Sequence, residues 1–152
     1  MRYKTFVALS LLIILSGCYG CPSTILPRDC REFFALLSRE QESKFRSYPV
    51  DKQVDLYLCG MNREPPEIGY AAYIAESGDK DIPYLLQRLK AEQLEIRQMQ
   101  IIDIFVVLAI KGNLRGRQDV VDQLEEVVVK IRYEPVRLKA QRYIEEIKKN
   151  VG

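Results

Sequence analysis

The chain has 152 residues, 47% of them hydrophobic, so it is long enough to build one modest domain around a core. Its 23 Lys and Arg against 21 Asp and Glu give a formal charge of +2, which argues against the strong positive field of a dedicated nucleic-acid-binding protein. The absence of histidine excludes Ser-His-Asp and Cys-His catalysis and every histidine-ligated zinc site.

The first residues of the chain have the pattern of an export signal. Arg2 and Lys4 precede an apolar run over residues 5–15, and small residues follow the run. The run is too short for a transmembrane helix, which needs about 20 apolar residues. An ordinary secretory signal and an uncleaved anchor are two possible uses of such a segment.

The signal ends in Leu15-Ser16-Gly17-Cys18, which resembles the lipobox of bacterial lipoproteins, an apolar residue and two small ones before an obligatory cysteine. The resemblance implies removal of residues 1–17 as a signal peptide, a diacylglyceryl thioether on Cys18, and attachment to a membrane by lipid. Both surplus basic residues leave with the signal, so the mature chain is formally neutral. Tyr19 resembles the class sorted to the outer membrane, facing the periplasm, if the source has two membranes.

If Cys18 is lipidated, three of the four cysteines remain as available thiols. The Cys18-x-x-Cys21 spacing is then no redox or metal motif. An oxidising compartment allows at most one disulfide within the remaining three. We expect Cys30 to pair with Cys59, because both fall on predicted neighbouring helices. Cys21 with Cys30 is the second possibility.

The mature chain divides into a short tether, residues 18–28, and a helical domain, residues 29–152. Apolar residues at helical spacing predict a first helix over 29–40, and the polar stretch 41–48 is expected to interrupt the pattern. Further helices are predicted over residues 49–62, 67–76, 82–89, 95–111, 119–131 and 135–151.

Start and stop signals support these boundaries. Pro49 is expected to open its helix, and Asp81 and Asp119 are expected to cap theirs. Residues 101–110 are apolar almost all round, which predicts a helix buried between others. Their Ile and Val content leaves a strand followed by the loop 112–116 as an alternative.

Two acidic caps lie 38 residues apart and each opens a pair of helices, close to the roughly 40-residue period of helical-pair solenoids. The stretches 95–97 and 135–140 resemble the inner helix of HEAT repeats. The resemblance implies an all-α fold, a short HEAT-like α-solenoid of the units 49–77, 81–111 and 119–151, with an N-terminal capping helix. A plain helical bundle is the alternative.

Two groups of residues are candidates for a binding surface. Lys111, Arg115 and Arg117 crowd a loop before a helix, where phosphate of a lipid headgroup or an acidic partner could bind. Tyrosines are frequent at interfaces, although they also fill the edges of a core. Four of them fall on adjacent predicted helices: Tyr57, Tyr70, Tyr73 and Tyr84.

Carboxylates are the remaining route to catalysis. Neighbours such as Glu125 and Glu126 diverge by about 100° on a helix, so they form no natural acid–base pair. Asp103 interrupts the apolar run, and we expect it to face solvent or to pair with an arginine such as Arg137 or Arg142.

These observations predict a membrane-anchored lipoprotein of the bacterial cell envelope that is not an enzyme and acts as a protein-binding or scaffold module. Its expected partners are a membrane, through lipid on Cys18, and a protein of the envelope. No cofactor, metal or nucleic acid is expected. A structural lipoprotein needed for assembly of an envelope complex, or an enzyme with a carboxylate-based site, are the alternatives.

Overall fold

The computed structural model describes residues 26–152, and this part of the chain is all-α, as predicted, without a strand. One short 3₁₀ segment, η1, lies between two of the helices. The elements are α1 Arg28–Phe34, α2 Ser38–Ser47, α3 Val50–Gly60, α4 Tyr70–Ile74, η1 Ala75–Asp81, α5 Ile82–Ala91, α6 Glu95–Ile110, α7 Gln118–Val128 and α8 Glu134–Val151.

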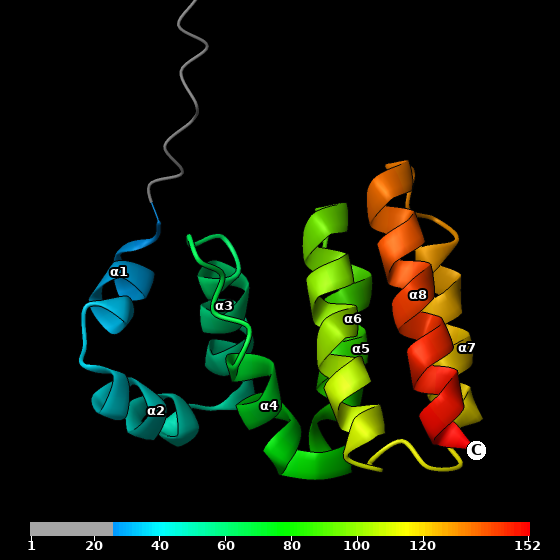
Figure 1. Cartoon of the computed structure of the whole chain (residues 1–152), viewed down its shortest axis with the longest axis horizontal. Helices are drawn as coiled ribbons and strands as arrows, with labels where there is room; N and C mark the ends of the chain where they lie inside the picture. Colours follow the sequence, from blue (N-terminus) through cyan, green and yellow to red (C-terminus); the bar gives the residue numbers. More distant parts are fainter. Residues whose placement is uncertain (1–25) are drawn as a thin grey trace, which may run out of the picture.

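The helices form a row that runs from α1 and α2 to α7 and α8 (Figure 1). Helices α3, α5, α6, α7 and α8 stand roughly parallel, whereas α2 lies across their direction. Within the row, α6 packs against α4 on one side and α8 on the other, while α7 packs against α5 and α8. The start of the described chain, the turn before α6 and the turn between α7 and α8 all lie at one end of the helices, which we call the proximal end. The loop 111–117 and the C-terminus lie at the opposite, distal end.

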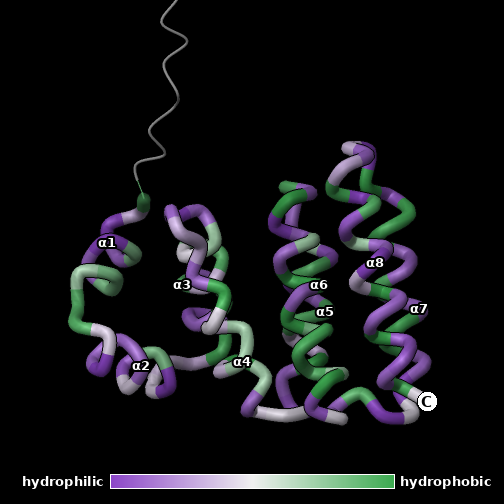
Figure 2. The backbone as a smooth tube through the Cα atoms, viewed as in Figure 1, coloured by the Kyte–Doolittle hydropathy of each residue, from purple (hydrophilic) through white to green (hydrophobic). Residues whose placement is uncertain are grey.

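The core is centred on α6, which is buried on most of its faces, as its uniformly apolar sequence predicts. Ile101, Ile104, Phe105 and Leu108 are completely buried. Figure 2 shows the hydrophobic character of this helix between its neighbours. The strand alternative for residues 101–110 is therefore wrong, since they form one continuous helix with the preceding residues.

The predicted interruption at residues 41–48 is also wrong, because these residues belong to helix α2. Only Phe45 of α2 is buried, so the helix has almost no apolar stripe in its sequence. Its exposed face is supported by an ion pair one helical turn apart, from Arg46 to Glu42 at 3.1 Å. The expected helix 29–40 is correspondingly split, since α1 ends at Phe34 and Leu37 is exposed.

The third predicted helix is shorter than expected, since α4 spans only Tyr70–Ile74 and continues into the tighter η1. Ile68, within the predicted helix 67–76, is exposed in the loop before α4. Gly78 has a φ of +73°, which interrupts the helical backbone inside η1.

Neither expected aspartate cap forms. Asp81 precedes α5 but makes no side-chain hydrogen bond to the N-terminus of that helix. Pro49, in contrast, directly precedes α3 as predicted. Asp119 lies inside α7, where its carboxylate binds Arg117. No helix formed by residues 26–152 is long and apolar enough to cross a bilayer.

Candidate functional site

The polypeptide joins the helical domain at the proximal end, beside the start of α1. The carbonyl of Pro27 accepts hydrogen bonds from the backbone N–H groups of Cys30 and Arg31, at 3.0 and 3.1 Å. Cys18, Cys21 and most of the tether lie outside the described residues. Lipidation of Cys18 therefore stays a prediction from the sequence. Leu26 marks where the described chain begins.

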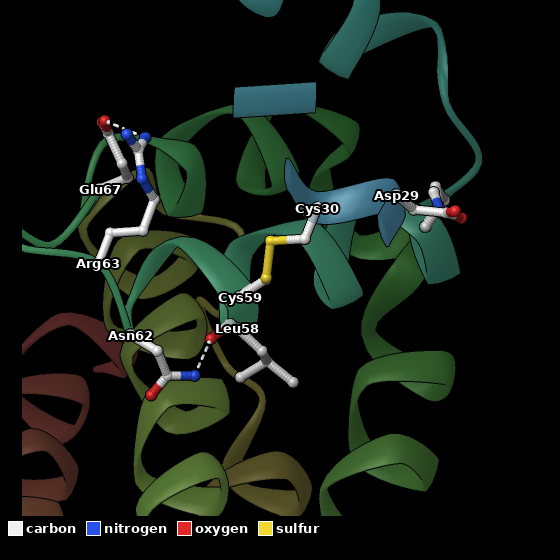
Figure 3. Close-up of a disulfide and its surroundings, with 8 residues drawn as sticks. Asp29, Cys30, Leu58, Cys59, Asn62, Arg63 and Glu67 are labelled. Carbon is white, nitrogen blue, oxygen red and sulfur yellow. Dashed lines mark hydrogen bonds and ion pairs between the residues drawn. A yellow bond between two sulfur atoms is a disulfide. The ribbon is translucent and has the colours of Figure 1, made fainter. Parts of the chain in front are cut away.

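Cys30 of α1 and Cys59 of α3 form a disulfide at this end of the molecule (Figure 3). Their Cα atoms are 6.4 Å apart and both side chains are buried. This is the first of the two pairings expected from the sequence. Beside it, Lys52 donates a 2.6 Å hydrogen bond to the Asp29 carboxylate, and this contact lowers the pKa of Asp29. Helices α1 and α3 are thus joined by a covalent bond and by an ion pair.

A cavity of about 300 Å³ adjoins the disulfide. Its lining includes apolar side chains of α3 and charged groups of both signs, among them Lys52, Asp55 and Arg97. Lys52 is already paired with Asp29, and Asp55 is 3.5 Å from Arg88. The cavity therefore has no field of a single sign that would select a charged ligand.

The four predicted interface tyrosines do not form one exposed group. Tyr57 is 0% and Tyr70 is 7% exposed, so neither is available to a partner, and their assignment to a surface is corrected. Tyr70 lies in an aromatic cluster with Phe33 and Phe45, and burial raises the pKa of Tyr70 to about 12. The remaining two, Tyr73 and Tyr84, are partly exposed.

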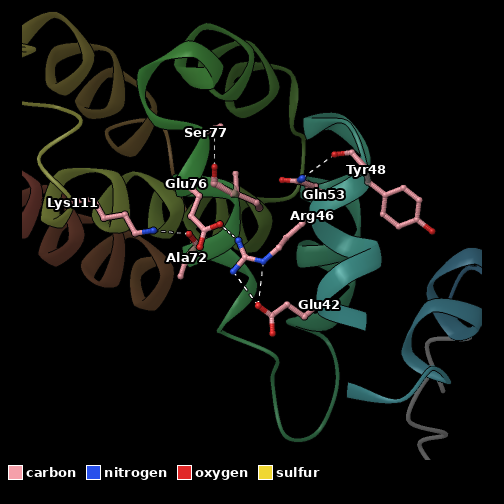
Figure 4. Close-up of polar contacts among 9 residues, drawn as sticks. Glu42, Arg46, Tyr48, Gln53, Ala72, Glu76, Ser77 and Lys111 are labelled. Atoms are coloured by element: carbon pink, nitrogen blue, oxygen red, sulfur yellow. Dashed lines mark hydrogen bonds and ion pairs between the residues drawn. The ribbon is translucent and has the colours of Figure 1, made fainter. Parts of the chain in front are cut away.

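Tyr73 of α4 lies beside a polar junction between α2 and η1, at which Arg46 meets Glu42 and Glu76 (Figure 4). The Arg46 guanidinium is 4.2 Å from the centre of the Tyr73 ring and forms ion pairs with Glu42 and Glu76. A cavity of about 330 Å³ is lined by Arg46, Tyr73, Glu76 and Lys80, among others. The junction attaches α2, which buries a single residue of its own, to the rest of the domain.

The predicted basic loop lies at the distal end, and two of its three charges already have partners. Lys111 donates a 2.9 Å hydrogen bond to the carbonyl of Ala72 (Figure 4). Arg117 binds both carboxylate oxygens of Asp119, at 2.8 and 2.9 Å, which lowers the pKa of Asp119. Arg115 is exposed. The structure thus gives Lys111 and Arg117 contacts that hold the loop to its neighbours.

Asp103 does not face solvent and its partner is a tyrosine, so the expected pairing with Arg137 or Arg142 is wrong. The Tyr57 hydroxyl donates a 2.9 Å hydrogen bond to the half-buried Asp103 carboxylate. Burial, and then the negative charge of Asp103, raise the pKa of Tyr143 to about 12. Asp103 therefore links α6 to α3 and lies beside α8.

Two further carboxylates have structural roles that the sequence did not indicate. Glu92 is buried, and its Oε1 accepts hydrogen bonds from the backbone N–H groups of Gln93 and Leu94, at 3.0 and 3.1 Å. Glu95 accepts hydrogen bonds from the backbone N–H groups of Arg132 and Tyr133, at 2.8 and 2.9 Å. These two bonds lower the pKa of Glu95 and join the turn before α6 to the turn before α8.

In residues 26–152, no group of three or more Cys, Asp or Glu side chains is placed to hold a metal ion. Comparison of the chain with models of known protein families, with curated proteins and with solved structures finds no match.

Proposed function

We propose that the protein is a bacterial lipoprotein, anchored to a membrane through Cys18, whose helical domain binds or scaffolds another protein of the cell envelope. The observation that carries this proposal is the sequence Leu15-Ser16-Gly17-Cys18 directly after an export signal. Acyl chains contribute about 0.8 kcal/mol per buried CH₂, so two or three of them hold a neutral domain at a bilayer. In a source with two membranes, Tyr19 favours the outer membrane.

The disulfide supports an exported location. Disulfides persist in oxidising compartments such as the periplasm and are rare in the cytosol. Cys30 and Cys59 are both buried at the junction of α1 and α3, where the bond is shielded from solvent. A chain that carries an export signal and a buried disulfide is consistent with folding outside the cytosol.

The arrangement of the helices supports a HEAT-like solenoid. Alternate helices contact one another along the row, with α4, α6 and α8 in one layer and α5 and α7 in the other. Such stacked pairs present long surfaces on which these folds bind other proteins, and this analogy is one of fold. In a plain bundle the helices would instead surround a shared central core.

The roles of the titratable groups favour binding over catalysis. The carboxylates of Asp103 and Glu92 accept hydrogen bonds that hold neighbouring elements together. The carboxylate of Glu95 does the same between two turns. A catalytic acid or base needs a free position facing a substrate, and each of these groups already has its partners.

Labelling cells with radioactive palmitate tests the anchor. The protein is expected to incorporate the label and to float with membranes, while the Cys18→Ser variant is expected to do neither. A variant with Cys21→Ser is the matched control, because it removes a neighbouring cysteine outside the lipobox and is expected to behave like the wild type. Equal labelling of the Cys18→Ser variant would refute the proposal.

Crosslinking in native membranes followed by affinity purification tests the binding role. We expect one envelope protein to be recovered in stoichiometric amount with the wild type. Paired variants at the partly exposed tyrosines, Tyr73→Ala and Tyr84→Ala, show whether their side of the domain contacts that partner. Turnover of a substrate by the purified protein would contradict a non-catalytic role.

A further inference from the structure

Four large apolar side chains are exposed at the proximal end of the row. Leu94 is 52%, Ile96 45%, Val129 78% and Tyr133 63% exposed. Three of the four flank helix ends, because Leu94 and Tyr133 precede α6 and α8 and Val129 follows α7. We call these four residues the proximal patch. They contribute little to the core, so folding alone does not account for their apolar character.

The two turns that carry Leu94 and Tyr133 of the proximal patch are joined to each other. The Glu95 carboxylate accepts hydrogen bonds from the backbone N–H groups of Arg132 and Tyr133, at 2.8 and 2.9 Å. The turn that carries Leu94 is therefore fixed to the turn that carries Tyr133. Apolar side chains on a preordered surface bind at a lower entropic cost than those on a mobile loop.

The position of Leu26 shows which end of the domain is nearest to a lipid on Cys18. Leu26 lines the cavity beside the Cys30–Cys59 disulfide. This start of the described chain lies at the proximal end, as the patch does, but at the opposite extreme of the row (Figure 1). It comes eight positions after Cys18, so the extended chain between them spans at most roughly 28 Å. Helix α6, with 16 residues, is about 24 Å long, which places the distal end a further helix length away.

We propose that the proximal patch docks on the surface of the bilayer in which the lipid of Cys18 is inserted. This inference rests on the proposed lipid anchor. The lipid would hold the α1 side of the row and the patch would hold the α7–α8 side, so that the row lies along the membrane. One anchor leaves a domain free to pivot, and a second contact on the same face removes that freedom.

The chemistry of the patch suits the boundary between headgroups and acyl chains. Tyrosine is favoured there, because its ring is apolar and its hydroxyl remains in a polar layer. The exposed Lys130 and Arg132 precede Tyr133 and can meet lipid phosphates. Glu134 is also exposed beside them, so the apolar side chains, more than net charge, are expected to provide the contact.

The chain contains no tryptophan, so one introduced tryptophan reports its own surroundings. The test compares Tyr133→Trp with Ile110→Trp in the full lipidated protein, bound to vesicles of phosphatidylethanolamine and phosphatidylglycerol. Ile110 is a matched control because it is 61% exposed at the distal end of the same row. Tyr133→Trp is expected to emit at shorter wavelength and to be quenched by brominated acyl chains, whereas Ile110→Trp shows neither effect.

A Val129→Asp substitution in the Tyr133→Trp protein is expected to reduce the quenching without changing the circular dichroism spectrum. Equal quenching with and without Val129→Asp would overturn the docking, as would an unquenched Tyr133→Trp in protein that floats with the vesicles. An emission shift that depends on protein concentration and not on brominated lipid would assign the patch to a second copy and also overturn it. Failure of the protein to float would overturn the anchor itself, and the docking with it.

Discussion

Reduction of the Cys30–Cys59 disulfide is expected to destabilise the domain by several kcal/mol. The two cysteines are 29 residues apart, and the bond between them restricts the unfolded chain over α1, α2 and α3. The loop-closure relation for about 30 residues gives a stabilisation of about 3.6 kcal/mol at 25 °C. This is a large part of the roughly 5–15 kcal/mol that stabilises an ordinary domain.

The reduced protein should nevertheless fold, because other contacts keep α1 in place. Phe33 is buried in the aromatic cluster, and Asp29 pairs with Lys52 of α3. Since these contacts do not need the covalent bond, the native helical content is expected to survive reduction. The loss should appear as a lower midpoint of unfolding, because the bond acts mainly on the unfolded chain.

Urea unfolding followed by circular dichroism measures this difference. The assay uses the full chain carrying Cys18→Ser and Cys21→Ser, so that no other thiol can exchange with the disulfide. Oxidised and reduced samples are compared, and the additional substitutions Cys30→Ser and Cys59→Ser give a control that reductant should not affect. If oxidised and reduced proteins unfold at the same urea concentration, the loop-closure reasoning is wrong for this chain.

Three further predictions use the same unfolding assay. The Tyr57→Phe substitution removes the hydroxyl that donates to Asp103 and is expected to lower the free energy of unfolding by about 1.5–3 kcal/mol. An unchanged midpoint of unfolding would contradict this prediction. The Gly116→Ala substitution is expected to lower the free energy of unfolding by about 1–2 kcal/mol, because Gly116 has a φ of +71°. Gly69 has a φ of −63° and open space around it, so Gly69→Ala should leave the free energy of unfolding unchanged. Because the pKa of Glu95 is lowered, its carboxylate is expected to stabilise the folded state fully above pH 4.5, and this stabilisation is lost as the pH falls further. The Glu95→Gln variant should therefore lose less stability on acidification than the wild type.

The helices that carry a strong apolar pattern could be predicted from the sequence. Residues 101–110 are apolar almost all round, which favours a buried helix over the strand alternative, and α6 spans Glu95–Ile110 against the predicted 95–111. Helix α2 could not be found in the same way, because Phe45 is its one buried residue. It is held by contacts with distant parts of the chain, such as the ion pair from Arg46 to Glu76, which no local sequence pattern predicts.

Some features of the candidate site could likewise be predicted from the sequence and others could not. The disulfide could be predicted because few pairings were open and two cysteines lay on neighbouring helices. The sequence marked Asp103 as unusual, but not its partner, since Tyr57 is 46 residues away and meets it only when α3 packs on α6. A spacing in sequence also cannot distinguish a buried tyrosine from an exposed one, as Tyr57 and Tyr73 show.

The row of helices has a consequence for how the protein reaches its folded state. Most contacts join elements that are neighbours or next neighbours along the chain, such as α6 with α8 and α7 with α8. Chains dominated by such local contacts fold in microseconds to milliseconds, faster than those that must first close long loops. Successive helix pairs can therefore dock in the order in which they become available.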